Sequence, residues 1–347
     1  MVRGPSLVPG ATVAGGRYRL LNAHGGSGLL RFWHAFDTVS EHDVALTIVG
    51  PAQSSHASSD PAQHDRVGGR GEAEGPQAVL RRTLRLDRIE SPGVATVLDV
   101  VLDRSSGIVV AEWTAGRSLA EVAATGPCPV GAARAVVALA GAADAADHLD
   151  AALALDHPDR IRISTSGNAV LAFPGISAGA THQSDVQGLG AILYALVAGR
   201  WPLPAPVRTP AADGQAAGMP QASRGPAGAV VAAHLLRAGV PFELSAVIDR
   251  ALQPAGGHCT AAAVRAVLKQ TTAEDQQTDL AAAILDPHAS PMSTTDQRRS
   301  GAEGRATRFA LALRSRRLFL ARITLSSAAV LTLAYVTTQV MSLSGGG

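Results

Sequence analysis

The sequence predicts an α+β chain of two lobes, a small strand-rich N-lobe and a larger helical C-lobe, followed by one C-terminal transmembrane helix. Three observations predict this arrangement. Strand-like segments and one helix come before residue 114, alanine-rich helical segments follow it, and an uncharged run lies near the end of the chain. Strands first and helices afterwards are typical of α+β folds, in which helices cover one face or one end of an antiparallel sheet.

Composition sets the size of the core and excludes some functions. The 347 residues are 46% hydrophobic and 17% charged, which suffices for one large two-lobed domain or two ordinary ones. A net charge of +2 and an aromatic content of 3% argue against a nucleic-acid partner. Cys128 and Cys259 match no metal-ligand spacing, so we expect two free thiols in a reducing compartment. We expect no metal and no cofactor.

The N-lobe is predicted over residues 14–113, after a tail of residues 1–13. RYRLL, LLRFWHAF and HDVALTIV have the alternating or continuous apolar character of strands. A helix is predicted in QAVLRRTLRLDRI, and we expect Pro92 to stop it. VATVLDVVLD and SGIVVAEW then predict a pair of strands. Residues 51–76, rich in Pro, Gly and Ser, are predicted to be a flexible insertion.

The C-lobe is predicted over residues 114–270. Helical period and propensity occur in AARAVVALAGAADAADHLDAAL, SDVQGLGAILYALVAG, PFELSAVIDRAL and TAAAVRAVLKQ. Residues 204–228, rich in Pro, Gly and Ala, are predicted to be a second flexible insertion. Ser184 and Asp185 lie at the start of the second helix, and we expect them to cap it.

The last part of the chain predicts a membrane anchor. We expect a juxtamembrane linker over residues 271–317, a transmembrane helix over 318–343 and a short external tail over 344–347. No charged residue occurs from Ile323 to Leu343, which is long enough for a helix to cross the hydrocarbon layer. Four arginines precede this run and none follows, which predicts a single-pass protein of the inner (plasma) membrane with cytoplasmic lobes. The alternatives are a buried C-terminal helix or an interfacial one.

The order of the segments resembles a bacterial serine/threonine protein kinase over residues 14–270. AHGGSGLLRFWHAFD resembles the glycine-rich loop with its strands, in which Gly25 is kept while Ser27 and Leu30 replace the second and third glycines. VALTIV resembles the V-A-I-K strand, and VVAEWTAGRSLAEV the hinge and the following helix. SDVQGLGAILYALVAGRWPLP is similar to a helix of the large lobe. In it Asp185 matches the aspartate that braces the catalytic loop of active relatives, which is the alternative to its role as a cap. The resemblance implies a bilobal protein-kinase-like fold.

The residues that carry phosphoryl transfer in this family are replaced at the matching positions. Thr47 stands for the strand lysine that pairs the phosphates, and Arg82 for the helix glutamate that pairs that lysine. LALDHPDR matches the loop H-R-D-x-K-P-x-N, with Leu155 for the catalytic aspartate and Arg160 for the metal-binding asparagine. AFPG matches D-F-G, with Ala172 for the metal-binding aspartate.

These replacements predict a pseudokinase. Loss of a positioned base alone costs about 10²–10⁴ in rate, and here the metal ligands and the phosphate clamp are replaced as well. A shifted alignment, in which His157 to Asp159 imitate the catalytic loop, supplies no lysine, because the first lysine of the chain is Lys269. The alternative hypothesis is an active transmembrane serine/threonine kinase with atypical motifs.

Thr278 is the first candidate phosphoacceptor in the predicted linker. Acidic residues precede it and aliphatic residues follow it in AEDQQTDLAAAIL, which suits the substrate preference associated with actinobacterial receptor kinases. A phosphate there adds about two negative charges, an epitope for an arginine-bearing reader such as a forkhead-associated domain. Thr294, Thr295 and Thr307 are weaker candidates. The alternative for each is an ordinary solvated threonine.

A closer resemblance indicates a cellular process. GGRYRLL, FWHAFD, VALTIV, TLRLDRIESPGVATVLDVV, LDHPDRIRIS and YALVAGRWPLP resemble the cytoplasmic pseudokinase region of the mycobacterial lipid II flippase of the mouse-virulence-factor family, which one transmembrane helix follows. This implies a regulator of peptidoglycan precursor export that a partner kinase phosphorylates and that then recruits a forkhead-associated-domain protein. The sequence contains no polytopic transporter portion, so we expect any flippase to be a separate partner.

Overall fold

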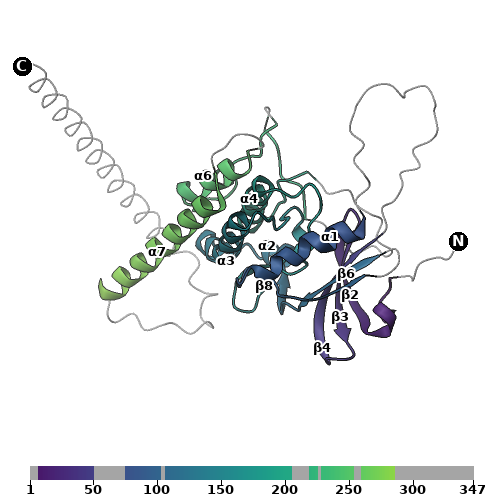
Figure 1. Cartoon of the computed structure of the whole chain (residues 1–347). Coiled ribbons are helices and arrows are strands. Elements are labelled where there is room, and N and C mark those ends of the chain that lie inside the picture. The colour runs from purple at the N-terminus through teal and green to yellow at the C-terminus, as the bar shows by residue number, and fades with distance from the viewer. Residues whose placement is uncertain are drawn as a thin grey trace, which may run out of the picture. The chain divides into compact units, whose positions relative to one another are not determined.

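The computed structural model describes residues 7–50, 75–102, 106–204, 219–225, 228–253 and 259–285. Nearly all of them belong to one compact unit, residues 1–279. A second unit, residues 280–347, contributes only the end of one helix to the described residues. Figure 1 shows strands in the first part of the first unit and helices in the rest, which confirms the predicted α+β order.

The N-lobe is built on a six-stranded sheet in the order β1-β2-β3-β4-β6-β5, with antiparallel neighbours throughout. Its strands are β1 (Thr12–Val13), β2 (Tyr18–Ser27), β3 (Leu30–Asp37), β4 (His42–Val49), β5 (Val97–Leu102) and β6 (Gly107–Glu112). The central strand β4 is buried without a break from Val44 to Val49, because hydrophobic clusters cover both faces of the sheet there. All strands predicted for this lobe are found.

Helix α1 (Pro76–Thr83) packs on this sheet and continues as the short 3₁₀ segment η2 (Leu84–Arg88). Val79 and Leu80 are its buried apolar residues. The α-helical part ends well before Pro92, where we expected the stop. Tightening into a 3₁₀ turn is frequent at helix ends, and Thr83 is a β-branched residue of low helix propensity.

The C-lobe is helical, with a three-stranded sheet in the order β7-β8-β9 beside it. Its elements are α2 (Leu119–Ala124), α3 (Pro129–His148), α4 (His182–Ala198), α5 (Ala233–Leu236), α6 (Phe242–Ala251), α7 (Ala261–Leu285), β7 (Gly116–Ser118), β8 (Ile161–Ser164) and β9 (Ala169–Leu171). Alanine side chains of α3 and larger aliphatic ones of α4 form the centre of its core. The four predicted helices correspond to α3, α4, α6 and α7.

Predicted boundaries differ from the structure at several points. Residues 12–13 of the predicted tail form β1, which pairs with β2, and Pro76, the last residue of the first predicted insertion, begins α1. Helix α7 runs to Leu285, so residues 271–285 of the predicted linker, Thr278 included, are helical. TTAEDQQTDLAAAIL contains good helix formers and neither Gly nor Pro, and Pro287 comes only after it. Residues 219–225 of the second predicted insertion return to the C-lobe, where Ala222 is buried and the Trp201 N–H donates to the Pro220 oxygen at 2.8 Å.

Within the described residues, α3 is the helix long and apolar enough to cross a membrane. Its buried alanine and leucine side chains belong to the C-lobe core, so a core helix accounts for its composition. The predicted transmembrane helix at 318–343 and tail at 344–347 lie outside the described residues and gain no support from the structure. The same holds for residues 286–317 of the linker, with Thr294, Thr295 and Thr307.

Candidate functional site

The loop of residues 153–160, which matches the catalytic loop, is held from the core side by Asp185 of α4. The Leu153 N–H donates to Asp185 Oδ2 at 2.6 Å, and the Leu155 N–H donates to Oδ1 at 3.2 Å. Burial raises the pKa of Asp185 to about 6, although these hydrogen bonds act in the opposite direction. Gly188 lets helix and loop approach, since a Cβ there would lie 2.2 Å from the Leu155 oxygen.

The cap of α4 is Thr181 rather than Asp185. Thr181 Oγ1 accepts the Ser184 N–H at 3.1 Å, and Ser184 Oγ accepts the Thr181 N–H at 2.8 Å, which forms a reciprocal capping box. The prediction that Asp185 caps the helix is therefore wrong. Asp185 lies one residue beyond the capping box, and its carboxylate instead accepts the N–H groups of the neighbouring loop.

Arg160 closes the same loop from the cleft side. Its side chain is fully buried, with Nε donating to the Phe173 oxygen at 3.2 Å. Nη1 donates to the Ala154 oxygen at 2.5 Å and to Asp156 Oδ1 at 3.0 Å, and Nη2 donates to the Gly175 oxygen at 2.6 Å. The guanidinium therefore joins the loop to the AFPG segment, at the position that matches the metal-binding asparagine.

Two further replaced positions meet Arg160 in this cleft. Ala172 and Thr47 are both buried. A Cβ placed on Gly175 would lie 3.0 Å from Thr47 Cγ2 and 3.8 Å from Arg160 Nη2. The Ala172 N–H donates to the Arg160 oxygen at 2.9 Å. The structure thus brings β4, the 153–160 loop and the AFPG segment close together. At the matching positions Ala172 presents a methyl group and Arg160 a guanidinium.

Leu155, at the position that matches the catalytic base, packs in the hydrophobic core. It is 1% exposed and belongs to the C-lobe core cluster, with α4 close to its backbone at Gly188. The two carboxylates of the same loop have local partners. Asp156 binds Arg160, and Asp159 Oδ2 lies 3.7 Å from His157 Nδ1.

Arg82 attaches α1 to the segment that follows AFPG. Its Nε donates to the Ile176 oxygen at 3.1 Å, and the Ile176 N–H donates to Thr83 Oγ1 at 3.0 Å. In active kinases a lysine–glutamate ion pair links the helix to the neighbouring strand. Here two hydrogen bonds to one residue link α1 to the C-lobe side of the cleft. Thr83 has no signal in the sequence that marks it for this role.

The hairpin that matches the glycine-rich loop rests on Asp159. Strands β2 and β3 stay paired up to Ser27 and Leu30, so the connection is a tight turn. Gly25 has a φ of +95°, and a Cβ there would lie 2.0 Å from Asp159 Oδ2. In active kinases this hairpin covers the nucleotide phosphates; here a carboxylate of the chain itself lies against its backbone.

A stack of two rings and one arginine joins β3, the residue after β6, and β8. His34 stacks on Trp113 with ring centroids 3.8 Å apart, and Arg162 lies over the Trp113 ring at 4.4 Å. Arg162 also donates to the Thr114 oxygen at 2.9 Å and the Gly116 oxygen at 2.7 Å. Burial, aided by the positive charge of Arg162, lowers the pKa of His24 to about 4. Sequence spacing does not mark these residues, because they come from three distant segments.

The residues at these positions do not fit the magnesium ion that phosphoryl transfer uses. Magnesium binds carboxylate and amide oxygens in active kinases, whereas the matching positions here hold the cation of Arg160 and the methyl group of Ala172. Within the described ranges, no group of three or more His, Cys, Asp or Glu side chains is placed to hold a metal ion.

Solved structures of the PknI kinase domain of Mycobacterium tuberculosis share this architecture. The unmodified domain matches with a TM-score of 0.51 at 19% identity, over 77% of this chain and 100% of that one. A point mutant of that domain matches with a TM-score of 0.53 at 18% identity, over 77% of this chain and 99% of that one. A double mutant matches with a TM-score of 0.52 at 18% identity, over 77% of this chain and 100% of that one. The chain has a protein-kinase-like fold. No known family profile matches the sequence, and at these identities the likeness to PknI concerns the fold alone.

Proposed function

We propose that this kinase-like chain is a pseudokinase, a catalytically inactive protein that works as a scaffold. Arg160 carries the proposal. A fully buried guanidinium, hydrogen-bonded to three carbonyl oxygens and one carboxylate, stands where an active kinase places a magnesium ligand. A fixed positive charge opposes binding of a second cation at close range, because unscreened like charges repel strongly in a buried site.

The neighbouring replacements support the same proposal. Leu155 has no group that accepts the proton of a substrate hydroxyl, and Ala172 has no oxygen for a metal ion. The His34–Trp113 stack and Arg162 lie at the predicted hinge. Positioning and electrostatic stabilisation supply nearly all the catalysis of phosphoryl transfer. Without charged groups that position the substrate and stabilise the transition state, this region is better suited to a structural role.

The scaffold role rests on the resemblance to the pseudokinase region of the lipid II flippase. In this proposal the chain is anchored in the plasma membrane, and a separate serine/threonine kinase phosphorylates a threonine between the core of the C-lobe and the anchor, first of all Thr278. A forkhead-associated-domain protein then binds the phosphothreonine and regulates export of peptidoglycan precursors with a lipid II flippase. Thr278 lies within α7.

Two assays on the full-length chain test the proposal. With radiolabelled ATP and magnesium, we expect neither autophosphorylation nor transfer to a general substrate protein. After phosphorylation by an added kinase, we expect the chain to retain a forkhead-associated-domain protein that the unphosphorylated chain does not retain, and Thr278→Ala to weaken this. Equal recovery with both forms would contradict the scaffold role, while magnesium-dependent transfer would contradict the inactivity.

The alternative, an active kinase with atypical motifs, draws on two observations. Asp185 braces the 153–160 loop, and that loop carries the carboxylates of Asp156 and Asp159. Of the two, Asp156 is the more exposed, at 47% of its side chain. Transfer activity that Asp156→Asn abolishes and Asp159→Asn keeps would favour this alternative.

A further inference from the structure

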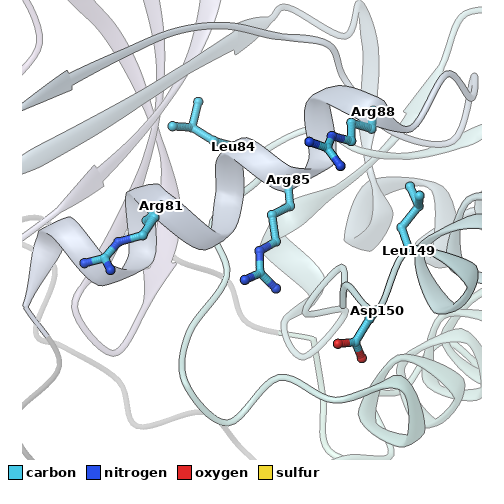
Figure 2. A pocket seen from close by; sticks show the side chains of 6 residues that line it. All are labelled: Arg81, Leu84, Arg85, Arg88, Leu149 and Asp150. Atoms are coloured by element: carbon cyan, nitrogen blue, oxygen red, sulfur yellow. The ribbon is translucent and has the colours of Figure 1, made fainter.

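A pocket of about 550 Å³ lies beside α1 and η2, and none of its residues belongs to the cleft described above. Figure 2 shows the helix carrying three arginine side chains on one wall and Leu149 with Asp150, which follow α3, on the other. Its lining residues are Arg81, Leu84, Arg85, Arg88, Leu149 and Asp150.

The three arginines form a row. They are four and three residues apart, a spacing that places side chains on one face of a helix or 3₁₀ segment. All three are exposed, and among the described residues no hydrogen bond or ion pair engages their guanidinium groups. Arg82, which lies between them in sequence, is directed elsewhere, to the Ile176 oxygen. The row therefore presents three positive charges to a ligand.

Apolar surface lies next to these charges. Leu84 is 49% exposed and Leu149 is 42% exposed. Asp150, on the far wall, is 99% exposed, and one of its oxygens lies 3.6 Å from His182 Nε2. The pocket thus offers three cations, two aliphatic side chains and one carboxylate.

We propose that this pocket is a docking site for an acidic peptide segment of a partner protein. Carboxylates of the segment would pair with Arg81, Arg85 and Arg88, and an aliphatic side chain beside them would cover Leu84 and Leu149. Arginine is suited to such a site because its planar guanidinium binds a carboxylate through two parallel hydrogen bonds. The proposal is independent of whether the cleft is active.

The charges and the shape of the pocket favour this occupant over two others. A symmetric dimer built on this surface would bring the arginine row of one copy against that of the other, and like charges in contact oppose association. An anionic membrane attracts arginines too, but it presents a wide surface, whereas here the arginines line a concave pocket whose far wall bears a carboxylate. A peptide is narrow enough to enter such a pocket, and a neutral residue opposite Asp150 would avoid repulsion from its carboxylate.

The spacing of the three arginines also limits where the acidic residues of the peptide segment can lie. Arg81 to Arg88 span about 12 Å, at a rise of about 1.5 Å per residue in α1 and about 2.0 Å per residue in η2. Three acidic side chains on successive turns of a peptide helix match this length, with leucines beside them on the same face. The binding should weaken with salt, because exposed ion pairs are screened by mobile ions.

Fluorescence anisotropy with the full-length chain tests the site. The probe is a labelled helical peptide with three glutamates and two leucines on one face, and the comparison probe replaces the glutamates by glutamine. We expect the glutamine peptide to bind at least tenfold more weakly. Arg85→Glu with Arg88→Glu should lower the affinity for the acidic peptide by about 100-fold, from about tenfold per charge pair. Arg85→Lys with Arg88→Lys, which keeps the charges, should lose far less.

Two matched variants show whether a loss of affinity comes from this pocket, from the overall charge of the chain, or from misfolding. Asp150→Asn removes a like charge, and asparagine tolerates the positive φ of 50° at this position, so we expect two- to fivefold tighter binding. Arg250→Glu, an exposed position on α6 outside the pocket, should leave the affinity unchanged. Equal losses at Arg250 and at the row would overturn the proposal. So would binding to vesicles with an anionic lipid, lost in the row variants, without binding of the peptide.

Discussion

The loop of residues 153–160 has two sides that differ in what they preserve. On the core side, the carboxylate of Asp185 accepts the N–H groups of Leu153 and Leu155, the arrangement in which an aspartate of active kinases braces this loop. On the cleft side, Arg160 binds the carbonyl oxygens of Ala154 and Gly175 where an active kinase binds a metal ion. One side is held by a carboxylate of α4, and the other by a guanidinium at the position that matches a metal ligand.

This difference teaches that the position of such a loop does not depend on the reaction it serves elsewhere. Backbone N–H groups of a buried loop need an acceptor in any state of the protein. Asp185 supplies it whether or not phosphate is transferred. The carbonyl oxygens on the opposite side need donors, and a guanidinium supplies them without a ligand.

The largest expected effect is that of removing Arg160. Arg160→Ala leaves the Ala154, Phe173 and Gly175 oxygens without their donor and creates a cavity, so we expect a loss of about 4 kcal/mol in the free energy of unfolding. Urea unfolding measures this. Arg250→Ala, at an exposed position, is the control and should change the stability by less than about 0.5 kcal/mol. A loss below about 1 kcal/mol for Arg160→Ala would show that the guanidinium does not hold the cleft together.

Removing Asp185 breaks the other side of the loop. Asp185→Ala leaves the N–H groups of Leu153 and Leu155 buried without an acceptor, and we expect a loss of about 3 kcal/mol. Asp185→Asn keeps one acceptor oxygen and should lose less. If both variants unfold at the urea concentration of the parent, the brace is not the basis of the loop position.

Two buried histidines should make the free energy of unfolding depend on pH. Burial lowers the pKa of both His24 and His157 from 6.5 to about 4. As the pH falls from 6.5 toward 4, the unfolded chain binds protons at these sites and the folded chain does not, so the free energy of unfolding should fall. Urea unfolding at several pH values measures the slope, and His157→Phe should flatten it. An unchanged slope would contradict the burial of a neutral imidazole.

Asp185 acts in the opposite direction over the same range. Its pKa is raised from 3.8 to about 6, so the folded chain binds a proton there before the unfolded chain does, and this adds stability as the pH falls. We therefore expect Asp185→Asn to make the acid-induced loss steeper than in the parent. A shallower loss in this variant would indicate that Asp185 stays ionised in the folded chain.

The smallest expected effect concerns the start of α4. Thr181→Ala removes one half of the capping box and should cost about 1 kcal/mol, well below the cost of Asp185→Ala. Thermal unfolding compares the two. A larger loss for Thr181→Ala than for Asp185→Ala would reverse the assignment of cap and brace.

The sequence predicted most of the framework, because its signals are local. Alternating apolar residues marked the strands from Tyr18 to Val49, and alanine-rich periodicity marked α3 and α4. The substituted positions Thr47, Arg160 and Ala172 come from matching short motifs in order. In the structure the Ala172 N–H donates to the Arg160 oxygen, and Gly175 lies against Thr47 and Arg160.

The remaining features depend on contacts between distant segments. The stack of His34 on Trp113 under Arg162 joins residues from three parts of the chain, and no spacing predicts it. Thr181 and Asp185 are both acceptable helix caps by residue type, so only the position of the 153–160 loop decides between them. The prediction ended the last helix of the C-lobe at residue 270, whereas α7 continues to Leu285.

Calorimetric titration of the full-length chain with ATP and magnesium tests the central claim most directly. If Arg160, the Ala172 methyl group and the stack on Trp113 occupy the cleft, the titration should show no saturable heat of binding at ATP concentrations that saturate an active kinase domain measured alongside. Saturable binding that requires magnesium and is lost in Trp113→Ala would contradict the account.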